Sequence, residues 1–137
     1  MVSQPKRTHP GRVLPTTYNP STQPDAAVWL SWSEAERLRL VVLFHASHRI
    51  RVNGGKAHAA MHVIVENQIA TGFGPTVRAM ARLQQQGLAR HEALHAVGAV
   101  VAEHLHGLLA GEVPADAGPS QQQLNAAIDG LAASQGK

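Results

Sequence analysis

The chain has no cysteine, which excludes disulfide bonds and any metal site built from thiolates. Aromatic residues make up only 4% of its 137 residues, so we expect a core of aliphatic side chains and alanine. No apolar run is as long as a membrane span, and none follows Lys6 and Arg7 as a secretory signal would require. We therefore expect a single cytoplasmic domain with no membrane segment.

The chain also lacks a strong excess of either charge. Its formal net charge is +3 with histidine neutral, and the basic residues are spread along the sequence. The tightest basic group is Arg49, Arg51 and Lys56, and it has no aromatic residue between its members that could stack on bases. Nucleic acid is therefore not expected as a partner.

The apolar residues follow a helical period. No segment alternates polar and apolar residues as a half-buried strand does. Five prolines in residues 1–24 predict an irregular tail, attached to the rest of the chain at Tyr18. A helical bundle is predicted over residues 25–111, followed by a loop and a short C-terminal helix in residues 112–137. The predicted class is all-α: a compact bundle of four to five helices with an irregular, proline-rich N-terminal tail.

Capping residues and glycines predict where the helices begin and end. Asp25 can cap a short helical turn, and Ser33 with Glu36 forms a capping box that opens a helix to about Ser47. Gly87 suits a left-handed C-cap. The remaining predicted helices are 56–71, 76–86, 89–110 and a short last helix, which Ser120 caps after a loop at Pro119.

The most informative pattern is a pair of histidine doublets, each with a spacing of four residues. One doublet is His58 and His62, with Glu66 four residues further on, and the other is His91 and His95. Residues four apart lie on the same face of an α-helix, one turn above the other. Each helix therefore offers two imidazoles from one stripe.

Two such stripes facing each other would form a site for a divalent metal ion, because imidazole and carboxylate bind zinc, iron and nickel. The predicted ligands are His45, His58, His62, Glu66, His91 and His95. Within this set Glu66 is a ligand or a bridge to a second ion, and His45 is a ligand or a hydrogen-bonding partner of one. The alternative is that all are core histidines, satisfied by carboxylates and backbone carbonyls.

The second doublet also has the sequence His91-Glu92-Ala-Leu-His95, which matches the zinc-peptidase pattern His-Glu-x-x-His. In that pattern the glutamate is the general base that acts on a metal-bound water. Gly98 extends the match, but Val101 stands where the longer pattern requires a third histidine. A small metalloenzyme is therefore an alternative, either a metal-dependent hydrolase that uses Glu92 or an oxidative site that uses iron, and enzymatic activity is left open. In the other interpretation Glu92 is a first-turn carboxylate favoured by the helix dipole.

A third hypothesis needs no metal. In it the histidines are structural, and the chain is an interaction module that forms a homodimer through small and β-branched residues of one helix. The candidate face consists of Ala93, Val97, Val100 and Val101.

Several segments together resemble a known family. They are Trp29-Leu30, Glu36-Arg37, Leu43-Phe44-His45, His58-Ala-Ala-Met-His62-Val-Ile-Val-Glu66-Asn67-Gln68 and Gly87-Leu-Ala-Arg90-His91-Glu92-Ala-Leu-His95-Ala-Val-Gly98. Residues 25 to about 105 resemble a family of small bacterial proteins that form a domain of unknown function. The resemblance implies that the six predicted ligands occur together as a set, and it implies no activity.

Overall fold

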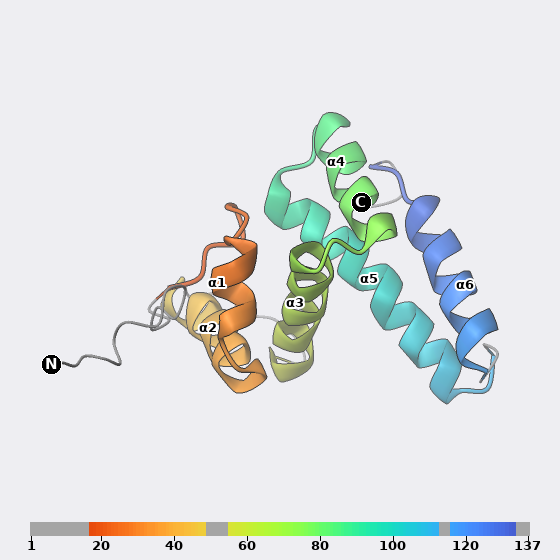
Figure 1. Ribbon diagram of the computed structural model, residues 1–137, viewed down its shortest axis with the longest axis horizontal. Helices are drawn as coiled ribbons and strands as arrows, with labels where there is room; N and C mark the ends of the chain where they lie inside the picture. Colours follow the sequence, from red (N-terminus) through yellow and green to blue (C-terminus); the bar gives the residue numbers. More distant parts are fainter. Residues whose placement is uncertain (1–16, 49–54, 113–115, 134–137) are drawn as a thin grey trace, which may run out of the picture. The chain divides into compact units, whose positions relative to one another are not determined.

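The computed structural model describes residues 17–48, 55–112 and 116–133, and within these ranges it has six α-helices and no strand (Figure 1). The predicted all-α class is confirmed. The helices are α1 (Ala26–Ser31), α2 (Glu34–Ser47), α3 (Gly55–Ala70), α4 (Gly74–Gln85), α5 (Arg90–Leu109) and α6 (Ala117–Asp129). The chain divides into two compact units, Met1–Thr71 with α1 to α3 (unit 1) and Gly72–Lys137 with α4 to α6 (unit 2).

The described part of the predicted tail, residues 17–24, contains no helix. Tyr18 is buried in this segment, so the tail is attached at the residue that the sequence predicted. Arg49 and Arg51 of the basic group lie outside the described residues. None of the six helices combines the length and the apolar content needed to cross a bilayer. The predicted domain bounds after residues 24 and 111 stay predictions.

Local capping fixes the starts of α1 and α2. Asp25 accepts a hydrogen bond from the backbone N–H of Val28 at 3.1 Å. Ser33 and Glu36 form the predicted capping box, in which each side chain accepts from the other's backbone N–H, at 3.1 and 2.8 Å. These bonds satisfy donors that a helix start would otherwise leave to water. Both predicted caps are therefore confirmed.

The core of unit 1 combines aromatic and aliphatic side chains. Its α3 packs against both α1 and α2. The buried cluster consists of Tyr18, Trp29, Leu40, Val41, Ala59 and Val63. The prediction of a purely aliphatic core is therefore wrong for unit 1. Most of the chain's few aromatic residues lie in this unit, where each buried ring removes a large apolar area from water.

A buried arginine links the three helices of unit 1. Arg37, on α2, donates from Nε and Nη2 to the carbonyl oxygens of Trp29 and Leu30 at 3.0 and 3.1 Å. Its Nη1 donates to Asn67 Oδ1 of α3 and to Glu34, both at 3.0 Å. Asn67 Oδ1 also accepts from the indole N–H of Trp29 at 2.8 Å. The guanidinium therefore donates to carbonyl groups at the end of α1, of which that of Trp29 also accepts from the backbone N–H of Trp32 at 3.2 Å.

Unit 2 is built from α4, α5 and α6, which pack against one another in pairs. Its buried apolar residues include Ala79, Met80, Leu83, Ala93, Leu94, Val97, Val101, Ile128 and Leu131. This core is aliphatic and rich in alanine, as expected from composition. Arg82 of α4 donates to the carbonyl oxygens of Ile128 and Leu131, at 3.0 and 2.9 Å, and so satisfies backbone groups around the end of α6.

In unit 2, the end of α4 agrees with the prediction from sequence and the start of α6 does not. Gly87 has φ of 106°, which confirms the left-handed C-cap after α4. The prediction for the last helix is wrong, because α6 begins at Ala117 after Asp116. Ser120 therefore lies inside the helix, and Pro119 is helical. Proline is tolerated in a first turn because the missing N–H would have no partner there.

An exposed ion pair between α4 and α6 predicts a pH-dependent effect on stability. Arg78 donates two hydrogen bonds to Asp129, at 3.2 and 3.0 Å. These bonds lower the pKa of Asp129 below its ordinary value of 3.8. The unfolded chain then binds the proton more readily, so the stabilisation is complete above that ordinary value and is lost as the pH falls through the lowered pKa.

We therefore expect Asp129→Asn to lower the Tm slightly at neutral pH and to have no effect at about pH 2. Thermal unfolding followed by circular dichroism at the two pH values measures this difference. Glu103→Gln is the control, because it removes one carboxylate charge from an exposed position in the middle of α5, away from both helix ends. Equal losses in the two variants would contradict the assignment to the ion pair.

Candidate metal centre

Unit 1 brings three of the predicted ligands together. His45 lies in the last turn of α2, and His58 and His62 lie on successive turns of α3. The ring centroids are separated by 4.9 Å between His45 and His58, 5.0 Å between His45 and His62, and 5.0 Å between His58 and His62. We call this arrangement the histidine triangle. It forms because α2 packs against α3.

The spacing of ring nitrogens is suitable for a metal ion. His45 and His62 are 7% and 3% exposed, and they offer ligand nitrogens within 4.8 Å of each other. A tetrahedral zinc ion with Zn–N bonds of about 2.0–2.1 Å holds two nitrogens about 3.3 Å apart. Small rotations of the side chains are therefore enough to bring both nitrogens onto one ion.

Hydrogen bonds determine which ring nitrogen carries the lone pair. His45 Nδ1 lies 2.8 Å from the carbonyl oxygen of Val41, which can only accept, so Nδ1 carries the proton. The hydroxyl of Tyr18 donates its one proton to Glu66 Oε2 at 2.6 Å. His62 Nδ1, 3.3 Å from the same hydroxyl, must then be the donor to its oxygen. In both rings the lone pair lies on Nε2, which is therefore the nitrogen that could bind a metal.

His58 is the third imidazole of the triangle, although it is not among the histidines whose ligand nitrogens lie within 4.8 Å of one another. Burial lowers the pKa of His58 below its ordinary value of 6.5, and the neighbouring His45 lowers it further. Metal ions bind the neutral form of imidazole. His58 is therefore in its metal-binding protonation state near neutral pH.

Glu66 lies one turn beyond His62 on α3 and is 1% exposed. A buried carboxylate is costly unless it is hydrogen-bonded, and Tyr18 supplies a short bond to it. The sequence identified Tyr18 only as the point where the tail is attached and missed this role. Nothing in the local pattern could have revealed it, because the two residues are 48 positions apart.

His91 and His95 form a second pair, in unit 2. They lie in the first two turns of α5, with ring centroids 4.4 Å apart and ligand nitrogens within 4.8 Å of each other. His91 is half-buried and His95 is exposed. Their doublet is thus arranged as a pair that could hold a metal ion. That they bind the same ion as the histidines of α3 stays a prediction.

Glu92 accepts a backbone hydrogen bond at the start of α5. It is exposed, and its Oε1 accepts a hydrogen bond from the backbone N–H of Ala89 at 2.9 Å. This bond satisfies a donor at the start of α5, which favours the interpretation of Glu92 as a first-turn carboxylate. The hydrolase hypothesis, with Glu92 as general base, stays a prediction.

The predicted dimer face is covered within the chain. Ala93, Val97 and Val101 are buried, and Val100 is half-buried. These residues therefore offer little surface to a second copy. The homodimer stays a prediction.

Comparison with protein-family models found no family that matches the chain, and comparisons with curated proteins and with solved structures found no match either. The resemblance drawn from the two histidine segments stays an expectation. Function is therefore argued from the chemistry of the site.

Proposed function

We propose that the chain is a metal-binding protein in which His45, His58 and His62 bind a divalent transition-metal ion. The observation that carries this proposal is the orientation of the two buried rings. The Nδ1 protons of His45 and His62 are directed to a backbone carbonyl and a tyrosine hydroxyl. Metal-binding histidines almost always donate their other ring N–H in this way, which fixes the tautomer and the direction of the ligand nitrogen.

The set of donors favours particular ions. Neutral imidazoles with one carboxylate suit zinc, iron and nickel, whereas calcium and magnesium prefer oxygen ligands alone. We propose Glu66 as a further ligand or a bridge, since a carboxylate can accept from Tyr18 with one oxygen and bind an ion with the other. His91 and His95 are proposed as ligands on the sequence pattern and on the spacing of their nitrogens.

The experiment is elemental analysis of protein purified without a histidine tag, followed by calorimetric titration with zinc, ferrous iron and nickel. We expect at least one equivalent of one of these ions. We expect His62→Ala to weaken its binding by at least about 100-fold, because a structural zinc site contributes about 10–16 kcal/mol through its four ligands. His48→Ala is the matched control, since it removes an exposed histidine, the residue that follows α2.

A second variant, His91→Ala/His95→Ala, tests the prediction of a shared ion. If unit 2 supplies ligands to that ion, the double variant also loses high-affinity binding. If the pair is separate, the double variant keeps the equivalent that His62→Ala removes. A parent protein that takes up none of the three ions would refute the proposal, and so would a His62→Ala variant that binds as tightly as His48→Ala.

A further inference from the structure

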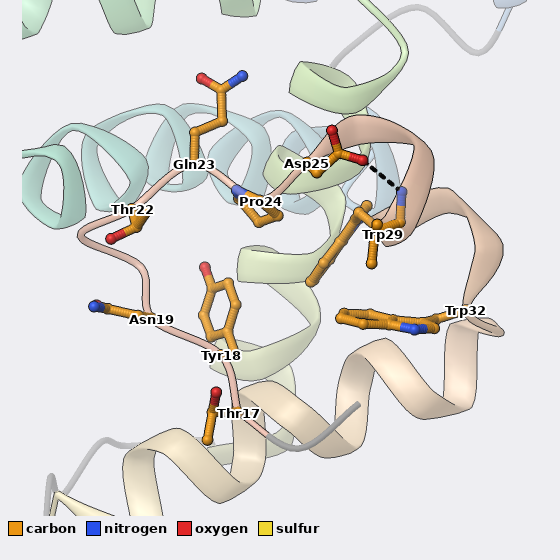
Figure 2. Close-up of a pocket in the computed structure, with 10 residues that line it drawn as sticks. Thr17, Tyr18, Asn19, Thr22, Gln23, Pro24, Asp25, Trp29 and Trp32 are labelled. Carbon is orange, nitrogen blue, oxygen red and sulfur yellow. Dashed lines mark hydrogen bonds between the residues drawn. The ribbon is translucent and has the colours of Figure 1, made fainter. Parts of the chain in front are cut away.

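The segment before α1 forms a pocket of about 340 Å³ in unit 1 (Figure 2). Its walls come from residues 17–25 and from Val28, Trp29 and Trp32. Sites for small organic molecules typically have volumes of roughly 300–1,000 Å³. None of the three histidines of the triangle lines this pocket, so it is a different site from the metal centre.

Two aromatic rings of the pocket are fixed from behind by α3. The Tyr18 hydroxyl donates to Glu66 at 2.6 Å, and the Trp29 indole N–H donates to Asn67 at 2.8 Å. Each ring thus uses its donor on α3. The two centroids are 5.7 Å apart, and both rings are buried. They form a rigid base, which is typical of preformed ligand sites.

Trp32 supplies the accessible aromatic surface. It follows α1, is half-buried, and lies 6.0 Å from Trp29 with the two ring planes inclined by 61°. Figure 2 shows its indole beneath that of Trp29, on the side of the pocket away from Asp25. The face of an indole carries a negative electrostatic potential, which attracts cations more strongly than that of any other side-chain ring.

The charge of the pocket has one sign. Asp25 is exposed, and one of its oxygens accepts from the backbone N–H of Val28 (Figure 2). Among the described residues that line the pocket there is no lysine, arginine or histidine. The remaining polar lining residues are neutral amides and hydroxyls, including Asn19, Thr22 and Gln23. A carboxylate and an indole face both attract a cation and repel an anion.

We propose that this pocket binds a small organic cation that carries an alkylated ammonium group. The Trp32 ring contacts the alkyl groups around the charge, and the Asp25 carboxylate, on the other side of the pocket, attracts the cation without contacting it. The neutral amides and hydroxyls accept or donate hydrogen bonds to a polar substituent of the ligand. Choline is small enough for the pocket, and it has both an alkylated ammonium group and a hydroxyl.

The test compares choline with dimethylbutanol, its uncharged carbon analogue, by calorimetric titration and by quenching of tryptophan fluorescence. We expect dimethylbutanol to bind at least about fivefold more weakly, because it lacks the charge. We expect Trp32→Leu to weaken choline binding by about tenfold and Trp32→Phe to weaken it less, because phenylalanine keeps an aromatic face with a weaker negative potential. Asp25→Asn should weaken it by about fivefold while still capping α1, since asparagine is an equally good cap.

Asp116→Asn is the matched control, because it removes a carboxylate from the residue before a helix outside the pocket. It should bind choline as the parent does. Equal binding of the two probes would overturn the proposal, as would no binding of choline by the parent, or binding that neither Trp32→Leu nor Asp25→Asn weakens. Circular dichroism confirms that each variant is folded. Metal binding by the triangle is expected to be unchanged in all of them, which keeps this test independent of the proposed function.

Discussion

Replacing Arg37 with methionine should lower the free energy of unfolding of unit 1 by about 3 kcal/mol. Arg37 is 8% exposed, and its guanidinium donates to two carbonyl groups at the end of α1 and to Asn67 of α3. Its loss leaves these acceptors without that donor. The ion pair with Glu34 contributes little, because the glutamate is exposed to solvent. Methionine keeps most of the aliphatic volume, so the cavity term is small.

Arg39→Met is the matched control for this effect. Arg39 lies two residues further along α2 and is exposed, so the substitution makes the same change in charge and chemistry at the surface. It should alter the free energy of unfolding by no more than about 0.5 kcal/mol. Urea unfolding followed by tryptophan fluorescence measures both variants. Similar losses in the two would show that charge or composition, and not the buried hydrogen bonds, determines the result.

Replacing Tyr18 with phenylalanine should have the second large effect, on stability and on metal binding together. Without metal, the buried Glu66 loses a hydrogen bond of 2.6 Å, and bonds to charged groups contribute about 1.5–3 kcal/mol. With metal, His62 loses the acceptor for its Nδ1 proton. Removing such a partner typically weakens metal affinity by about 10–100-fold.

Two measurements separate these parts of the Tyr18→Phe effect. Urea unfolding in the presence of a chelator reports the loss at Glu66, and calorimetric titration of the folded variant reports the loss at His62. Ser21→Ala is the control, since it removes an exposed hydroxyl from the same segment and should change neither quantity. If Tyr18→Phe unfolds like the parent, the Glu66 bond has no energetic importance. If it also binds metal like the parent, Tyr18 has no part in orienting His62.

The sequence predicted those features of unit 1 that depend on residues close together in the chain. The Asp25 cap and the Ser33–Glu36 capping box each join residues three positions apart, and the shared face of His58 and His62 follows from the helical period alone. The predicted start of α6 was wrong because aspartate and serine are both suitable N-cap residues, so Asp116 and Ser120 were both candidates. Pro119 does not distinguish them, since proline is tolerated in the first turn of a helix.

The parts of the site that the sequence could not predict depend on contacts between distant residues. Tyr18 and Glu66 are 48 positions apart, and Arg37 and Asn67 are 30 apart. One sign of the arginine network was present: Arg37, Val41 and His45 are spaced by four, so they lie in one row of α2, and all three are buried. A charged residue in an apolar row requires buried acceptors, but the row does not tell where they come from.

The distribution of aromatic residues between the two units makes them optically distinct. Both tryptophans and the one tyrosine of the chain precede residue 33 and belong to unit 1. Indole emission therefore reports on unit 1 alone, whereas far-ultraviolet circular dichroism reports on the helices of both units. A single denaturation experiment recorded with the two probes follows the units separately. Coincident curves mean that both unfold in one cooperative transition, and different midpoints mean that each has a stability of its own.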